Sequence, residues 1–112
     1  MENKFTIKDG ALEHCTVNNS NVVIPDGVKV IKYSAFKKPD SYKGIDELKS
    51  VVIPKSVTLI ESKAFQYCDR LRKVSILGPA EIGSEAFLSC DDLEEVYLAD
   101  GVKSIGSECF AF

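Results

Sequence analysis

The sequence has 112 residues, of which 45% are hydrophobic and 28% charged, with a formal net charge of −3 and an isoelectric point of about 5.1. This balance predicts one folded domain and excludes a chain that is disordered throughout. The acidic surplus also argues against nucleic-acid binding, which needs clustered basic side chains. No apolar run is long enough to cross a bilayer, so we expect no membrane insertion.

The first residues, Met1 to Lys8, lack the apolar core of a signal peptide, so the sequence leaves the compartment unassigned. His14 and Cys15 are neighbours, but adjacent side chains of a strand point to opposite faces. Because a cysteine nucleophile needs a base placed beside it in space, we predict no catalytic residue and no enzyme. The four cysteines also lack the spacings of metal or redox motifs, so we expect neither a metal nor a cofactor.

From residue 22 onward one phrase recurs four times. The first two copies open with Val-Val-Ile-Pro, at Val22 and at Val51, and both continue to an Ala-Phe pair. The phenylalanines of the four copies, separated by 29, 22 and 23 residues, are Phe36, Phe65, Phe87 and Phe110. One copy alone cannot bury its apolar positions, whereas stacked copies form a continuous core.

The expected stack aligns equivalent apolar residues in five ladders. They are Val22/Val51/Val74/Val96, Ile24/Ile53/Ile76/Leu98, Ile31/Ile60/Ile82/Ile105, Phe36/Phe65/Phe87/Phe110 and Leu48/Leu71/Leu93. The spacing Leu71-x-x-Val74-x-Ile76 predicts a short strand with Ser75 pointing outward. For residues 83–87 we expect one short helical turn with Ser84 as its N-cap.

Residues 37–47 form a segment about six residues longer than its equivalents in later copies. Its proline, glycine and polar residues indicate a loop insertion. Two interpretations stay open: the loop contacts a partner through Tyr42 and Ile45, or it is a tolerated surface insertion.

The pattern Leu-x-x-Val-x-Ile-Pro-x-x-Val-x-x-Ile-x-x-x-Ala-Phe-x-x-Cys over residues 22–112 resembles the BspA-type leucine-rich repeat family. The resemblance implies an α/β-class leucine-rich-repeat solenoid, a right-handed superhelix that is β-rich, with short parallel strands and single helical or 3-10 turns. It implies one domain, 1–112, with a capping hairpin at 1–21 and four repeats at 22–112, the last incomplete. The sequence departs from the pattern at the insertion, at Leu77 and Ala99 in place of proline, and at Cys109 in place of alanine.

Outward strand positions are the candidate partner-binding residues. They are Val23, Val52, Ser75 and Tyr97 in one column and Lys49, Arg72 and Glu94 in another, with Tyr42 added from the loop. An apolar stripe on a sheet face is a common contact surface, but β-propensity and scattered apolar exposure also explain it. For the charged column, and for the adjacent Ser50/Lys73/Glu95, ion pairs between repeats are favoured over a ligand site.

Cys68 and Cys90 each follow a repeat phenylalanine by three residues, so they are expected to stack in adjacent coils. Neighbouring strands lie close enough for a disulfide. Buried free thiols are favoured, since the resemblance also implies cysteine at this position.

We therefore predict a non-enzymatic protein–protein interaction module with a protein partner. Family members are commonly secreted or cell-surface proteins, so the resemblance implies adhesion. The alternative is a structural spacer or a fragment of a longer repeat array. Because the sequence stops in mid-repeat at Phe112, we also expect an uncapped C-terminal end that allows formation of a homo-oligomer.

Overall fold

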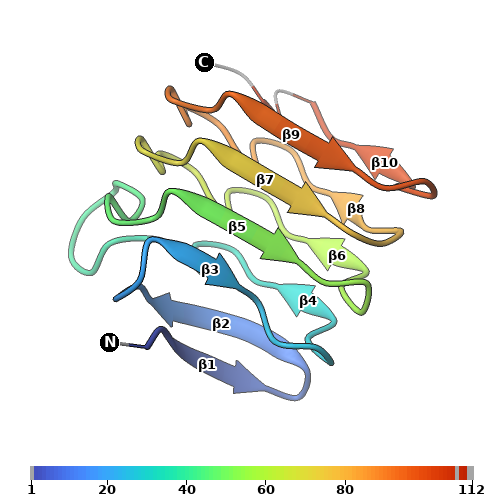
Figure 1. The fold of residues 1–112 in the computed structure, drawn as a ribbon, viewed down its shortest axis with the longest axis horizontal. Coiled ribbons are helices and arrows are strands. Elements are labelled where there is room, and N and C mark those ends of the chain that lie inside the picture. The colour runs from blue at the N-terminus through green and yellow to red at the C-terminus, as the bar shows by residue number, and fades with distance from the viewer. Residues whose placement is uncertain (1, 108, 111–112) are drawn as a thin grey trace.

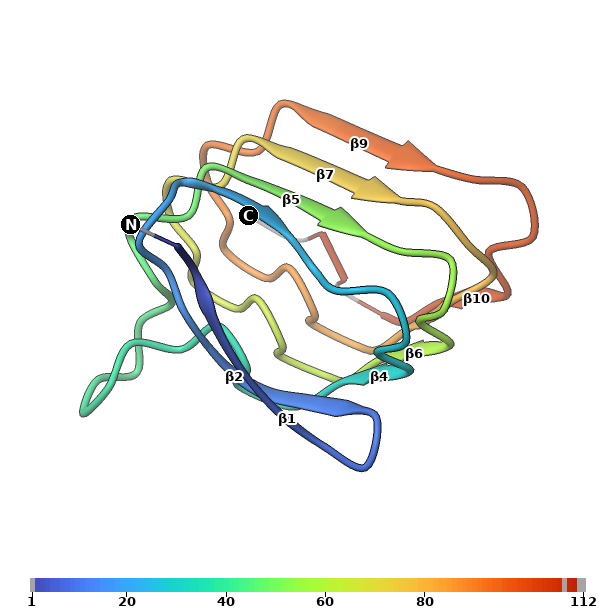
Figure 2. The same ribbon diagram turned by 60° about the horizontal axis from the view of Figure 1, so that its bottom comes forward.

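The computed structural model describes residues 2–107 and 109–110. In that part of the chain all regular structure is β-strand, arranged in two sheets (Figure 1). Each coil of the chain contributes one strand to each of the two sheets, and Figure 2 shows the sheets as two layers. The expected solenoid with short parallel strands is confirmed.

The front sheet, which faces the viewer in Figure 1, has the order β3-β5-β7-β9. Its strands are β3 (Asn21–Val23), β5 (Ser50–Ile53), β7 (Lys73–Ile76) and β9 (Glu95–Leu98). The back sheet has the order β1-β2-β4-β6-β8-β10. Its strands are β1 (Lys4–Lys8), β2 (Ala11–Thr16), β4 (Val30–Ile31), β6 (Leu59–Ile60), β8 (Glu81–Ile82) and β10 (Ser104–Ile105).

The strand register confirms the predicted ladders. In the front sheet Val51 lies between Val22 and Val74, and in the back sheet Ile60 lies between Ile31 and Ile82. Leu12 of β2, opposite Ile31 and fully buried, adds a rung that the repeated phrase does not contain. The hairpin is therefore part of the same apolar stack.

The phenylalanine ladder is a continuous stack of rings through the core. Ring centroids are 4.5 Å apart between Phe36 and Phe65, 4.9 Å between Phe65 and Phe87, and 5.3 Å between Phe87 and Phe110. Neighbouring ring planes differ by no more than 18°. Aromatic rings bury large apolar areas, so this stack is a major source of cohesion between coils.

The prediction of a helical turn at residues 83–87 is wrong. The described residues contain neither α-helix nor 3-10 helix, and residues 83–86 form a β-turn in which the Ala86 N–H donates to the Gly83 carbonyl at 3.2 Å. Glu85 has φ of 60°, in the left-handed region, which interrupts a right-handed helix. Ser34 and Lys63 have the same conformation at the equivalent positions, with φ of 59° and 63°. These three coils thus turn at a left-handed residue, and Ser84 caps no helix.

The inserted loop leaves the ladders intact because Ile45 occupies the place that Cys68 holds in the next coil. The Ile45 N–H donates to the Phe36 carbonyl at 2.9 Å, as the Cys68 N–H does to the Phe65 carbonyl at 3.3 Å. Gly44 has no room for a side chain, since a Cβ would lie 2.6 Å from the Cys68 nitrogen. Of the two side chains named in the partner-contact interpretation of this loop, Ile45 is therefore not available, because it is 5% exposed and belongs to the core.

The N-terminal hairpin covers one end of the stack. β1 pairs with β2 in antiparallel fashion through a turn at Asp9 and Gly10, whose φ values of 51° and 78° fit a tight hairpin turn. The register shifts between Thr6 and Ile7, and Lys4 and Lys8 are exposed on the outer strand. Irregular pairing and lysines both discourage the addition of another strand to a sheet edge.

All four cysteines are free and buried. The Cys68 thiol contacts the Phe36 carbonyl at 3.7 Å, and the Cys90 thiol contacts the Phe65 carbonyl at 3.2 Å. Cys109 fills the column in which Ala86 stands one coil earlier. The thiols therefore act as small core side chains.

Replacing Phe65, the fully buried ring between two stacked neighbours, by alanine should lower the free energy of unfolding by about 3–5 kcal/mol. Urea denaturation measures this change. Tyr33→Ala, at an aromatic ring that is 60% exposed, is the matched control and should change stability by about 0.5 kcal/mol or less. Equal losses in the two variants would contradict the role of the ring stack.

Burial raises the pKa of the Cys15 thiol from 9.0 to about 12 and that of Cys109 from 9.0 to about 11. Above pH 9 the unfolded chain loses these protons while the folded chain keeps them, so stability should fall as the pH rises from 9 through 11 and 12. Urea denaturation at a series of alkaline pH values measures the slope. The variant with Cys15→Ala and Cys109→Ala should lose this part of the dependence, and an unchanged slope would contradict the assignment.

Candidate interaction surface

The structure contains no constellation that points to catalysis or metal binding among the residues it describes. His14, the only histidine, lies 3.2 Å from the Lys37 carbonyl through Nε2, and the adjacent Cys15 is buried with a raised pKa. Within the described ranges no three histidine, cysteine, aspartate or glutamate residues are grouped to hold a metal ion. The same residues include no helix able to span a membrane.

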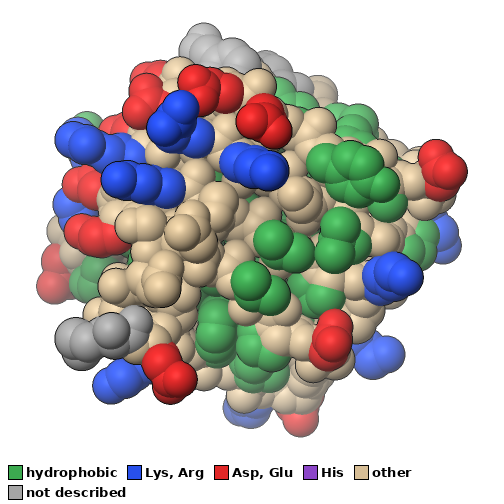
Figure 3. All heavy atoms as spheres, in the orientation of Figure 1, with side chains coloured by type: hydrophobic (Ala, Val, Ile, Leu, Met, Phe, Trp, Pro, Cys, Tyr) green, Lys and Arg blue, Asp and Glu red, His purple; other side chains and the backbone are tan. Residues whose placement is uncertain are grey.

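The front sheet brings the first predicted column together. Val23, Val52, Ser75 and Tyr97 lie opposite one another on β3, β5, β7 and β9. Val23 is 65% exposed and Tyr97 57%, while Val52 and Ser75 between them are half-buried. Figure 3 shows apolar side chains gathered over this sheet. We call these four residues the front column.

Charged side chains border the front column at the start of the strands. Arg72 donates to the Glu94 carboxylate from Nη2 at 2.6 Å and from Nε at 3.0 Å, so this predicted ion pair is confirmed. Among the described residues no ion pair joins Lys73 to Glu95, its opposite in the register. Lys49 is exposed beside them, and these charges line a shallow hollow (Figure 3). The column thus has a polar border on one side.

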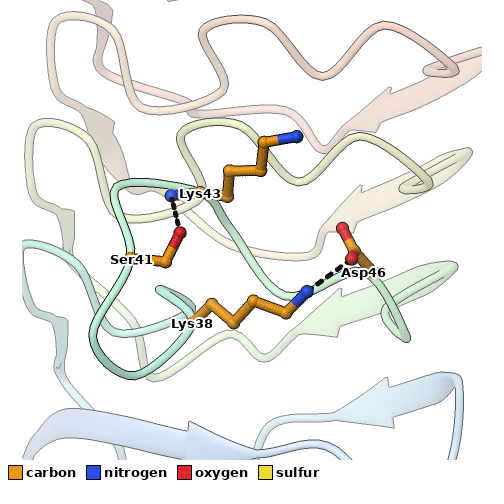
Figure 4. A network of polar contacts seen from close by, with 4 residues as sticks. All are labelled: Lys38, Ser41, Lys43 and Asp46. Carbon is orange, nitrogen blue, oxygen red and sulfur yellow. Dashed lines mark hydrogen bonds and ion pairs between the residues drawn. The ribbon is translucent and has the colours of Figure 1, made fainter.

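Tyr42 lies apart from the front column, on the loop that leaves the side of the stack (Figure 2). Its ring is 71% exposed and packs edge to face on Tyr67, with centroids 5.6 Å apart. Within this loop the Lys38 ammonium lies 2.6 Å from the Asp46 carboxylate (Figure 4). The hydrogen bond with Lys38 lowers the pKa of Asp46 below its usual value.

One exposed aromatic residue escaped the sequence analysis. Tyr33 is 60% exposed at a turn, although nothing in the repeated phrase marks it as outward. Val96 and Ile105 occupy their predicted ladders but are exposed, and their strands β9 and β10 are the terminal strands of the two sheets among the described residues.

Comparison with known proteins agrees with the architecture. A model of the BspA type leucine rich repeat region matches residues 5–112 as six copies, where the repeated phrase counts four from residue 22. The crystal structure of a leucine rich cell surface protein from Faecalibacterium prausnitzii A2-165 is similar, with a TM-score of 0.73 and 29% sequence identity. The match covers 95% of this chain and 31% of that protein.

The comparison with curated proteins found no match. The family model spans nearly the whole sequence, and the same repeat forms the stacked coils of the structure. The chain belongs to the BspA-type leucine-rich repeat family.

Proposed function

We propose that the chain is a non-enzymatic module that binds a protein partner through the front column. The observation that carries this proposal is the exposure of Val23 and Tyr97, 65% and 57%, within one column of aligned strands. Isolated exposed apolar residues are normal on protein surfaces, but Val23 lies beside the half-buried Val52, and only Ser75 separates Val52 from Tyr97. A mainly apolar patch that includes an aromatic ring is typical of the core of a contact surface.

The scaffold favours binding because it holds the contact residues rigidly. Strands pair on both sides of β5 and β7, which carry Val52 and Ser75, and on one side of β3 and β9, which carry Val23 and Tyr97. This pairing lowers the conformational entropy that is lost on association. Tyrosine is a frequent anchor at interfaces, and Tyr97 presents its ring at one end of the column. Lys49, Arg72 and Glu94 form a polar border, the arrangement that surrounds the apolar centre of many interfaces.

A location at the cell surface and a role in adhesion are part of the proposal. The similar crystal structure is that of a cell surface protein, and its identity to this chain is 29%. That protein is much longer, so what it does as a whole extends to this chain only as a proposal.

The second candidate function is that of a structural spacer within a longer array, without binding activity of its own. The observation that favours it is that this chain matches 31% of the similar surface protein. A spacer would tolerate charges in the front column, whereas a binding module would not.

The test uses peptides that are selected from a random-peptide phage library for binding to the intact chain. Selected peptides should bind Val23→Lys and Tyr97→Ala at least about tenfold more weakly, since truncating an anchor at an interface costs about 2 kcal/mol or more. Isothermal titration calorimetry measures the affinities. Both side chains are largely exposed, so circular dichroism should show an unchanged fold.

Tyr33→Ala is the matched control, because Tyr33 is equally exposed but lies outside the front column. Selected peptides whose affinities for the two front-column variants equal their affinity for the original chain would contradict the proposal. Failure to select any peptide that is sensitive to these residues would favour the spacer.

The loop offers an independent prediction. Replacing residues 37–44 by a two-residue Gln-Gly link keeps a glycine before Ile45 and joins Phe36 to Ile45 with the same number of residues as join Phe65 to Cys68. The shorter loop should raise the free energy of unfolding by about 1 kcal/mol, because closing it costs less entropy. The loss of the Lys38–Asp46 contact acts in the opposite direction. Unfolding measurements should find a stability within about 1 kcal/mol of the original. Peptide affinity should be unchanged, and its loss would assign binding to the loop.

A further inference from the structure

The shallow hollow beside the front column contains more cations than anions. It lies at the starts of the front strands, and its charged lining consists of Lys49, Arg72, Lys73, Glu94 and Glu95. Three cations against two carboxylates leave a surplus of one positive charge, although the whole chain has a net charge of −3. Figure 3 shows basic side chains next to the apolar side chains of this sheet. We call this feature the basic hollow.

Two of the three cations of the basic hollow have no anion bound to them. Arg72 is occupied by Glu94, through contacts of 2.6 and 3.0 Å. Lys49 and Lys73 are exposed, and within the part of the chain that the structure describes neither forms an ion pair. Glu95 stands opposite Lys73 on the next strand, but ion pairs between exposed side chains are weak. Both ammonium groups are therefore available to the carboxylate of a ligand.

The basic hollow and the front column lie on the same face of the sheet. Ser50 and Val52 are two residues apart on β5, and Lys73 stands opposite Ser50 on β7. Alternate residues of a strand point to one face and lie about 7 Å apart. The Ser50 hydroxyl donates to the Asn21 side-chain oxygen at 2.7 Å, so the amide nitrogen of Asn21 can donate to an anion in the hollow. Donors thus stand one strand repeat away from the apolar surface of Val52.

An extended peptide segment has the dimensions that this face requires. Its alternate side chains also point to one side, about 7 Å apart. It can therefore place a carboxylate over the basic hollow and an apolar side chain, two positions away, over Val52 and its neighbour Val23. Lysine ammonium groups only donate hydrogen bonds, so the group that complements Lys49 and Lys73 is an anion.

We propose that the basic hollow and the front column together bind an extended segment of the partner protein in which aspartate or glutamate stands two positions from an apolar residue. Lys49 and Lys73 then determine specificity, because they favour acidic segments over neutral or basic ones. This role rests on the proposed function, since the apolar residue of the segment contacts Val23 and Val52.

Peptides selected from the phage library against the intact chain test this role. Val23→Ser removes exposed apolar area without adding a charge, so loss of affinity for this variant identifies the peptides that use the front column. These peptides should contain an acidic residue two positions from an apolar one. By isothermal titration calorimetry, Lys73→Gln should weaken them at least about threefold and Lys73→Glu at least about tenfold.

Lys8→Glu is the matched control, because it changes the net charge as Lys73→Glu does but lies on β1, outside the front sheet. It should leave the affinity unchanged. Raising the salt concentration should weaken the complex of the original chain more steeply than that of Lys73→Gln, since ions screen exposed charges. Lys49 and Lys73 are exposed, so circular dichroism should show an unchanged fold in their variants.

A double-mutant cycle assigns the contact to the lysines. Replacing the carboxylate of the peptide by the corresponding amide should weaken binding to the original chain at least about threefold. The same replacement should have little effect on binding to the variant with Lys49→Gln and Lys73→Gln, because the interaction is already absent there.

Peptides that depend on Val23, but lack a carboxylate or bind Lys73→Glu as tightly as the original chain, overturn the role of the lysines and leave the proposed function intact. A scrambled peptide of the same composition that binds equally well also overturns it, because charge alone is then sufficient. If no selected peptide loses affinity for Val23→Ser, the proposed function fails, and the role of the lysines fails with it.

Discussion

Every coil of this molecule depends on the coil beside it, because the apolar residues of one turn are covered only by equivalent residues of the next. The strands are two to four residues long through most of the stack, too short to be stable alone. Their pairing is maintained because a shift of one residue would move Val51 or Ile60 out of its ladder. The same constraint explains the parallel phenylalanine rings, the buried thiols and the tight approach at Gly44.

This constraint leaves the outward side chains of the front sheet for function. They are free to vary, since they cover no neighbouring coil, and Val23 and Tyr97 make that face partly apolar. Such a surface suits a partner of different chemistry.

Most of the fold follows from the spacing of the repeated phrase, which predicts the ladders and the register of the strands. The phrase does not reveal that Leu12 completes a ladder, because the hairpin contains no copy of it. Because of the insertion, the sequence analysis did not recognise that Ile45 takes the position in its coil that Cys68 takes in the next coil. Both residues stand three positions before a ladder leucine. The helical turn expected around Ser84 fails because a positive φ at Glu85, a residue with a side chain, leaves no mark in the sequence. The front column follows from alternation along the strands, but the identity of its partner depends on groups that lie outside this chain.

Native-state hydrogen exchange in dilute, reduced protein tests most directly whether stability comes from stacking between coils. Strands covered on both sides should open only with global unfolding, so amides of β5 and β7 should exchange most slowly. Amides of β9 and β10, the terminal strands of their sheets among the described residues, should exchange faster. Uniform protection along the chain, or slowest exchange in β9 and β10, would contradict the account.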